Sequence, residues 1–136
     1  MRRGRRRSCA EGLPPLGDLE LAVLEHLWQA GETDVAEAHH ALGRRISPNT
    51  VGSALERLHR KGLAARRKVS HAYRYRPLLE RETFTARRAV DAAGGPSAVT
   101  DLGVLAAFLD ELTVADADVL DHLESLIARR RAKDGR

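Results

Sequence analysis

The most informative part of this chain is SPNTVGSALERLHRKGLAARRKVSHAYRYR, which runs from Ser47 to Arg76. Ser47 can accept a hydrogen bond from a first-turn backbone N–H, and Pro48 follows where its missing N–H costs nothing. This pair predicts a helix start, and Gly62 after two basic residues predicts its end. Helical spacing gives one apolar stripe, formed by Val51, Ala54, Leu55 and Leu58. The opposite face is polar and carries Asn49, Ser53, Glu56, Arg57 and Arg60.

Two short runs after this helix, residues 63–69 and 72–76, are typical of a hairpin with Ser70 and His71 in its turn. The hairpin carries a dense group of cations, namely Arg66, Arg67, Lys68, Arg74 and Arg76. Such a group suits a phosphate backbone, although a solvated strand face would have the same composition. Its position directly after a helix with an exposed polar face favours DNA.

Two further helices are predicted before this stretch. Asp18 is expected to cap a helix over residues 19–30, and Thr33 to cap a second over residues 34–42. Three short helices followed by a hairpin form the winged variant of the helix-turn-helix. His39 and His40 are adjacent and point about 100° apart, so we interpret them as surface or partly packed side chains rather than as metal ligands.

The chain after the hairpin predicts one linking helix and two amphipathic helices. A capping box at Thr113 and Asp116 is expected to open the last of these. Helices this short and this apolar cannot easily bury themselves alone, so we expect a partner subunit to cover them; folding back on the first domain as a lid is the alternative. The expected dimer interface consists of Val99, Leu102, Leu105, Phe108, Leu109, Leu112, Val119, Leu120, Leu123, Leu126 and Ile127.

The charge of the chain is divided along its length. The 136 residues have a net charge of +4, but residues 1–96 carry +7, residues 97–128 carry −7 and residues 129–136 carry +4. A basic front part is suited to a polyanion, and an acidic back part is suited to a protein partner. Five of the first seven residues are Arg, and this basic arm either solubilises the chain or adds phosphate and minor-groove contacts.

Catalytic motifs are not found in the sequence. It has no glycine-rich phosphate loop and no metalloprotease or hydrolase motif, so neither an enzyme nor a cofactor or metal is predicted. A lone cysteine, Cys9, gives no disulfide framework, and no apolar run has the length of a membrane span or a signal peptide. These features favour a cytoplasmic protein without membrane insertion.

The predicted fold class is mainly α with a small β-hairpin wing, an N-terminal winged helix-turn-helix being followed by a C-terminal helical dimerisation region. The expected organisation has five parts: a disordered basic arm (1–16), a winged-helix DNA-binding domain (17–78), a linking helix (79–95), a helical dimerisation region (96–131) and a basic tail (132–136). The residues alone leave open a winged helix that binds RNA or a protein and has no operator.

Three segments resemble the penicillinase-repressor family (BlaI/MecI type) of bacterial winged-helix repressors. They are LGDLELAVLEHLWQAGETDVAEAHHAL at 16–42, SPNTVGSALERLHRKGLAARR at 47–67 and AYRYRPLLERE at 72–82. The resemblance covers roughly half of the chain, and the back third matches only in character. It implies a homodimer that binds a palindromic DNA operator upstream of a regulated operon.

Carried over to this sequence, the resemblance places the base-reading start of the recognition helix at Asn49, Thr50 and Ser53. It places Arg57 and Arg60 nearer to the DNA backbone, where they join Ser47, Lys61 and the wing cations as expected contacts; Arg could alternatively read a guanine. Glu56 could accept from a cytosine, but we expect it to orient Arg60, its i+4 neighbour.

The sequence departs from the family pattern in three places. Ser70 and His71 stand where the wing of the family usually has a Gly-Arg type of turn. The antibiotic-responsive members are cleaved at an Asn-Phe bond through an upstream membrane sensor protease, but Phe84 here follows Thr83. The copper-responsive relatives carry a cysteine-rich C-terminal motif, and this chain has no cysteine after Cys9. Neither mode of induction is therefore predicted.

Overall fold

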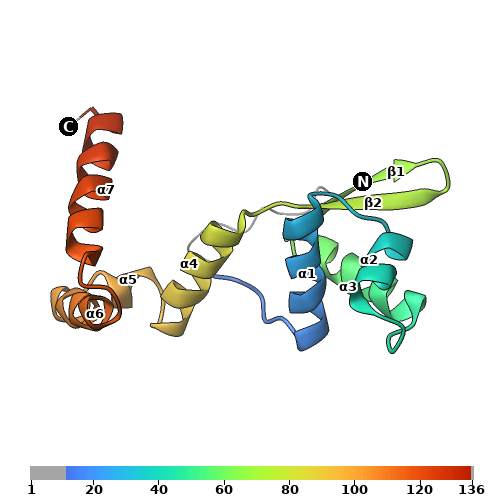
Figure 1. Cartoon of the computed structure of the whole chain (residues 1–136), viewed down its shortest axis with the longest axis horizontal. Coiled ribbons are helices and arrows are strands. Elements are labelled where there is room, and N and C mark those ends of the chain that lie inside the picture. The colour runs from blue at the N-terminus through green and yellow to red at the C-terminus, as the bar shows by residue number, and fades with distance from the viewer. Residues whose placement is uncertain (1–11, 136) are drawn as a thin grey trace. The chain divides into compact units, whose positions relative to one another are not determined.

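The computed structural model describes residues 12–135, which divide into two compact units that join between Ala92 and Ala93. Unit 1 contains α1 (Asp18–Ala30), α2 (Val35–Leu42), α3 (Pro48–Arg60), β1 (Ala64–Val69), β2 (Ala72–Pro77) and α4 (Arg81–Ala92) (Figure 1). Unit 2 contains α5 (Pro96–Val99), α6 (Leu102–Ala115) and α7 (Val119–Lys133). This element order confirms the predicted fold class, in which three helices and a hairpin precede further helices.

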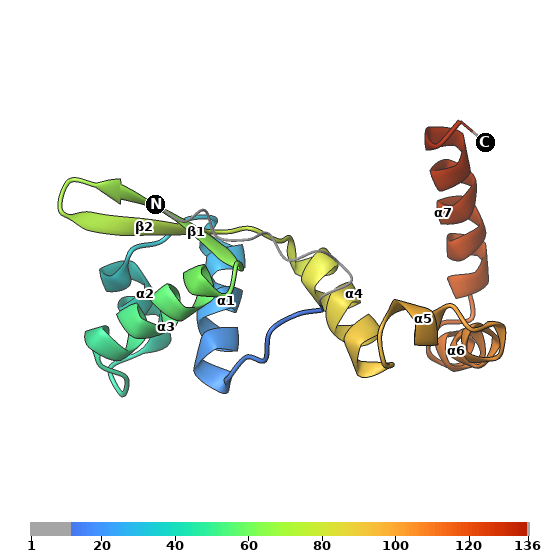
Figure 2. The same ribbon diagram turned by 180° about the vertical axis from the view of Figure 1, so that it is seen from behind.

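The core of unit 1 lies where α1, α2 and α3 pack together beside the hairpin (Figures 1 and 2). The apolar stripe predicted for α3 is fully buried, with all four of its side chains at 0% exposure. α1 contributes Val23, Leu24 and Leu27 to the same core. Because one side of α3 is buried in this way, its polar side faces solvent.

The start and the end of α3 confirm the local signals in the sequence. Oγ of Ser47 accepts the backbone N–H of Thr50 at 3.1 Å, and Pro48 is the first helical residue. Gly62, just after the helix, has a φ of 77°, a left-handed conformation that a residue with a Cβ rarely adopts.

The caps predicted for α1 and α2 are wrong by one residue each. α1 begins at Asp18, so Gly17 is its N-cap. Asp18 lies in the first turn, where its negative charge interacts favourably with the positive end of the helix dipole. The N-cap of α2 is Asp34, which forms a capping box with Glu37. Thr33 is not a cap because its backbone pairs with β2 instead.

The hairpin is antiparallel, and its register pairs Arg66 with Tyr75, Arg67 with Arg74 and Lys68 with Tyr73. Ser70 in the turn has a φ of 58°, so this non-glycine residue takes the left-handed conformation that a tight hairpin turn requires. The other edge of β2 pairs with Thr33, whose N–H donates to the carbonyl oxygen of Tyr75 at 2.9 Å and whose own carbonyl oxygen accepts the Tyr75 N–H at 2.7 Å. The wing is therefore hydrogen-bonded to the segment between α1 and α2.

Residues 12–16 pack against the helices of unit 1, whereas a disordered arm was expected for residues 1–16. The backbone N–H of Leu13 donates to Oδ2 of Asp91 in α4 at 2.7 Å, and Pro14 is buried. Leu13 and Leu16 pack against the core of this unit, which removes their apolar surface from water. The rest of the expected arm, residues 1–11, lies outside the described residues.

A linking helix was expected at residues 79–95, and the structure has the shorter helix α4 (Arg81–Ala92) there. α4 belongs to unit 1 and packs against its other helices. Phe84 is only 3% exposed, and its ring centroid lies 5.2 Å from that of Trp28 in α1. The indole N–H of Trp28 donates to the carbonyl oxygen of Leu79 at 2.8 Å. These contacts fix the start of α4 against α1.

Unit 2 departs from the sequence expectation at its helix ends. Asp101 caps α6, and α6 continues through Thr113, whose hydroxyl donates to the carbonyl oxygen of Leu109 at 2.7 Å instead of capping α7. α7 begins at Val119 after Asp118. No residue of α5, α6 or α7 is buried, and no helix within residues 12–135 combines the length and apolarity needed to cross a membrane.

Candidate nucleic-acid interface

The exposed face of α3 brings together the three residues that were expected to contact bases. Asn49, Thr50 and Ser53 are all exposed. The hydroxyl of Thr50 lies 2.8 Å from that of Ser47, so Thr50 shares its hydroxyl with the helix cap, whereas Asn49 and Ser53 have no hydrogen-bond partner for their side chains within residues 12–135. Asn49 and Ser53 are one helical turn apart and therefore present amide and hydroxyl groups on the same side.

An open groove lies between this face of α3 and the wing. α3 supplies one wall and the hairpin supplies the other, and the groove is lined by Val35, Pro48, Asn49, Gly52, Ser53, Glu56, Arg60, Arg66, Tyr73 and Tyr75. Most of these side chains are polar. The groove therefore combines expected base-reading residues with cations and tyrosines of the wing.

Glu56 connects the two walls of this groove. Its carboxylate accepts a hydrogen bond from the hydroxyl of Tyr75 and forms an ion pair with Arg66. The expectation that Glu56 orients Arg60 is therefore wrong, because two wing residues bind it instead. Burial alone would raise the pKa of Glu56, but the hydrogen bonds from Tyr75 and Arg66 outweigh it and leave that pKa below its ordinary value.

Tyr75 shows the opposite change in its pKa. Its side chain is 3% exposed, and burial together with the hydrogen bond to the Glu56 carboxylate raises the pKa of Tyr75 to about 12. Both causes favour the neutral phenol, since an ionised oxygen here would be desolvated and would face a negative charge. Tyr75 is thus a permanent hydrogen-bond donor to α3 at neutral pH.

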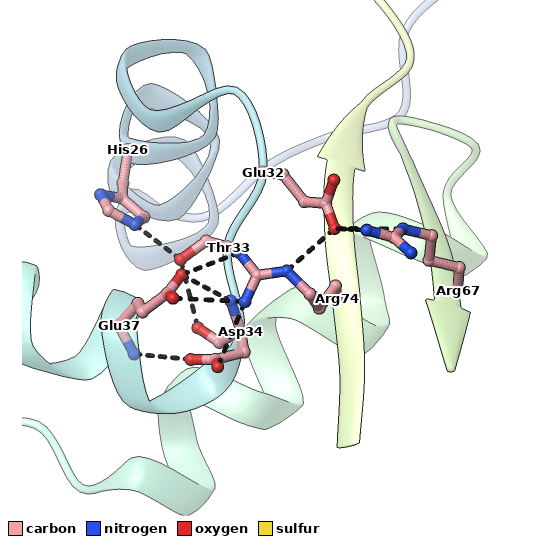
Figure 3. A network of polar contacts seen from close by, with 7 residues as sticks. All are labelled: His26, Glu32, Thr33, Asp34, Glu37, Arg67 and Arg74. Carbon is pink, nitrogen blue, oxygen red and sulfur yellow. Dashed lines mark hydrogen bonds and ion pairs between the residues drawn. The ribbon is translucent and has the colours of Figure 1, made fainter. Parts of the chain in front are cut away.

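A second network of ion pairs ties the wing to the start of α2 (Figure 3). Arg74 reaches Glu32 at 2.9 Å, Asp34 at 3.4 Å and Glu37 at 3.2 Å. Arg67 from the other strand joins the same Glu32 carboxylate at 2.8 Å. Figure 3 shows Glu32 between the two arginines, with Asp34 and Glu37 gathered around the far side of Arg74.

The pKa values of these carboxylates respond to the arginines. Burial would raise the pKa of Glu32, but hydrogen bonds from Arg74 and Arg67 bring it below its ordinary value. For Glu37 the hydrogen bond from Arg74 is the largest cause, and it lowers the pKa. Both side chains are therefore ionised at neutral pH and share their charge with the wing arginines.

Glu20 holds two more of the expected DNA-binding cations. It is only 7% exposed, and it pairs with Arg57 at 3.2 Å and also with Lys61. Lys61 donates a further hydrogen bond to the carbonyl oxygen of Pro15 at 2.8 Å. This buried carboxylate links the end of α3 to α1. It also partly neutralises the positive charges of Arg57 and Lys61, which are then less available to a ligand.

The cations among the expected backbone contacts therefore fall into two groups within residues 12–135. Arg57, Lys61, Arg66, Arg67 and Arg74 each have a carboxylate partner. Arg60, Lys68 and Arg76 have none in the described part of the chain, and each is exposed. Arg44 and Arg45, which the sequence reasoning missed, are likewise exposed and without an ion-pair partner there, in the turn just before the α3 cap. The sequence contains a signal for these two residues, because adjacent arginines just before the Ser-Pro start of a recognition helix are placed to contact DNA phosphates.

Among the described residues, no group of three or more His, Cys, Asp or Glu side chains is arranged to hold a metal ion. His39 is partly buried and His40 is exposed. The acidic cluster at the start of α2 is occupied by the guanidinium of Arg74.

The tyrosine that joins the wing to α3 generates a stability prediction. Tyr75→Phe removes a buried hydrogen bond to a carboxylate, and we expect the free energy of unfolding to fall by about 1–3 kcal/mol. Tyr73→Phe is the matched control, because Tyr73 is 39% exposed and its hydroxyl has no hydrogen-bond partner in residues 12–135; a change below about 0.5 kcal/mol is expected there. Urea unfolding measures both.

The pH dependence of the same variants provides an independent check. Because folding raises the pKa of Tyr75 from 10.0 to about 12, its contribution to stability is complete below pH 10 and is lost as pH rises toward 12. Tyr75→Phe should lack this loss, and Tyr73→Phe should keep it. Equal stability of the two variants at neutral pH, or the same pH profile for both, would contradict the assigned hydrogen bond.

Comparison with known proteins identifies the family of this chain. The family model described as penicillinase repressor matches residues 16–129, which include the wing, both networks and most of unit 2. Two relatives, each called "Transcriptional regulator BlaI" and each from a strain of Mycobacterium tuberculosis, are 35% identical to this chain over 112 residues, covering 79% of the chain and 81% of the relative. The chain therefore belongs to the penicillinase-repressor family of transcriptional regulators.

Proposed function

We propose that this chain is a sequence-specific DNA-binding repressor that acts as a homodimer on a palindromic operator. The observation that carries the proposal is the exposed polar face of α3, where Asn49, Thr50 and Ser53 stand clear of the core. Cations without carboxylate partners in residues 12–135 border this face, with Arg44 and Arg45 before the helix and Arg60 near its end. A helix presented in this way fits the major groove of DNA.

Base recognition is assigned to the start of α3. The amide of Asn49 can donate to and accept from the edge of an adenine, and the hydroxyl groups of Thr50 and Ser53 can serve several bases. Glu56 is not assigned to a cytosine, because its carboxylate is already bound by Tyr75 and Arg66.

Backbone contacts are assigned chiefly to the unpaired cations. Each phosphate neutralised by Lys or Arg releases counterions and contributes to a steep dependence of affinity on salt. Arg44, Arg45, Arg60, Lys68 and Arg76 can make such contacts without breaking an existing ion pair in the described part of the chain. Arg57, Lys61, Arg66, Arg67 and Arg74 would first have to share or exchange a carboxylate.

Dimerisation is assigned to unit 2 because its helices bury no residue on their own. Leu105, Phe108 and Leu109 are 38%, 42% and 38% exposed, and Leu126 and Ile127 of α7 are about half exposed. Each fully buried leucine contributes about 1.5–3 kcal/mol, so covering these side chains with a second copy would be strongly favourable. The acidic charge of residues 97–128 makes nucleic acid an unsuitable partner for this unit.

The mechanism that follows is steric. A homodimer presents two copies of α3, and its operator would then contain two half-sites separated by about one helical turn of DNA or a multiple of it. A dimer bound there excludes RNA polymerase from the same stretch of DNA, which represses transcription without any chemical step.

The base-reading assignment is tested with Asn49→Ala. On an operator duplex selected by the full chain from a random-sequence pool, we expect binding to weaken by about 1–3 kcal/mol, with much less change on a scrambled duplex. Gln29→Ala is the control, since Gln29 is exposed on α1. Equal losses on both duplexes would contradict base reading by Asn49, and a preference of the wild-type chain for RNA over either duplex would favour an RNA-binding module instead.

The dimer assignment is tested with Leu109→Glu in the full chain. Burying two charges in a symmetric interface should weaken association at least about a hundredfold, so that the variant sediments as a monomer at concentrations where the wild-type chain is a dimer. Ala107→Glu places the same charge on the opposite side of α6 and should leave the dimer intact. A variant at Leu109 that sediments like the wild-type chain would exclude this face as the interface.

A further inference from the structure

The groove between α3 and the wing has a specific distribution of side chains along the hairpin. The register of the strands places Arg66, Lys68, Tyr73 and Tyr75 on one side of the hairpin, because directly paired residues share a face. Arg66, Tyr73 and Tyr75 of this set line the groove, so this side faces α3. Arg67 and Arg74 form the next pair and lie on the other side, where Glu32 holds both.

The two tyrosines of this face have different environments. Tyr75 is buried and its hydroxyl is bound by Glu56, whereas Tyr73 is 39% exposed. The hydroxyl of Tyr73 has no hydrogen-bond partner within residues 12–135. Tyr73 lies nearer to the tip of the hairpin, beside Lys68, so its hydroxyl is a donor available to a ligand.

Arg66 fixes the orientation of the Tyr73 ring. Its guanidinium carbon lies 4.3 Å from the centroid of that ring, and the same guanidinium is held by Glu56 of α3. A planar cation that stacks on an aromatic face and binds a carboxylate restricts both partners. A chain of contacts therefore runs from α3 through Arg66 to Tyr73.

Arg66 also changes the charge of the groove. A free Glu56 carboxylate at this place would repel any phosphate that enters. Paired with Arg66 and hydrogen-bonded by Tyr75, it no longer presents an uncompensated negative charge. Arg60 and Lys68, both without a carboxylate partner in the described residues, then give the groove and its rim a positive charge.

We infer that one sugar–phosphate strand of bound duplex DNA lies in this groove, where Tyr73 donates its hydroxyl to a phosphate oxygen and Arg66 positions Tyr73. The inference deepens the proposed function and rests on it. With α3 in the major groove, the wing beside it would lie over the adjacent backbone, and the groove between them is where a DNA strand would pass. Phosphate oxygens accept hydrogen bonds from tyrosine as well as from Arg and Lys.

The experiment compares full-chain variants on the selected operator duplex and on the scrambled duplex over a series of KCl concentrations. Tyr73→Phe should bind both duplexes about three- to tenfold more weakly than the wild-type chain, because one hydrogen bond to a phosphate is lost. The slope of log K against log [KCl] should not change, since a neutral hydroxyl releases no counterion. Lys68→Met should reduce the steepness of that slope by about 0.9.

A double-mutant cycle tests the positioning role of Arg66. Arg66→Met is made together with Glu56→Gln, so that removing the cation leaves no uncompensated carboxylate in the groove. This pair should weaken binding without changing the salt slope, and Tyr73→Phe should cost little more in that background, because the hydroxyl is no longer held in place. Additive losses, or a slope that is about 0.9 less steep in the Arg66→Met, Glu56→Gln pair, would make Arg66 a phosphate contact and overturn its positioning role.

The remaining outcomes separate the inference from the proposed function. If the wild-type chain prefers the operator but Tyr73→Phe binds as tightly as the wild-type chain, the assignment of Tyr73 is overturned and the proposed function stands. If the wild-type chain shows no preference for the operator over the scrambled duplex, the proposed function fails and the inference fails with it. Thermal melting of Tyr73→Phe should match the wild-type chain, which confirms that altered binding is not a loss of folding.

Discussion

Tyr75 attaches β2 to the helices of unit 1 through its backbone, its ring and its hydroxyl. The backbone of Tyr75 exchanges two hydrogen bonds with Thr33, its ring is buried in the core, and its hydroxyl binds Glu56. A hairpin of two strands alone is only marginally stable in water. These contacts of Tyr75, together with the ion pairs of the wing arginines, give the wing a defined position beside α3 and so form the groove between them.

The positive charge of the wing is used in two ways. On one side, Arg67 and Arg74 form ion pairs with carboxylates at the start of α2, and these ion pairs add to the attachment of the hairpin. On the side that faces α3, Arg66 compensates Glu56, while Lys68 stays unpaired within the described residues. A count of basic residues in the sequence therefore overstates the number available to DNA. Within residues 12–135, the cations with no such partner lie before and at the end of α3, near the tip of the wing at Lys68 and near its base at Arg76.

Local sequence signals predicted most of the helices and the hairpin. The predictions that were wrong concern residues whose partners lie far away in the sequence. Ser47 and Pro48 mark the start of α3 because a cap needs only neighbouring backbone groups. Thr33 resembled a cap equally well, but its backbone pairs with Tyr75, far along the chain. Glu56 was assigned to Arg60 by helical spacing, yet residues from the wing bind it. The exposed face of α3 was predictable from periodicity alone, whereas the ion pairs of the wing were not.

In the proposed complex, α3 and the wing together hold a DNA duplex, with one such pair in each copy of a homodimer. A footprint of the full chain on its selected operator, with hydroxyl radicals for the backbone and methylation of guanine N7 for the major groove, tests this arrangement most directly. We expect two protected backbone patches, related by a two-fold axis and separated by about one helical turn or a multiple of it, each flanking a short stretch of major groove that is shielded from methylation. A single protected patch without symmetry, or protection of the backbone with the major groove left open, would contradict it.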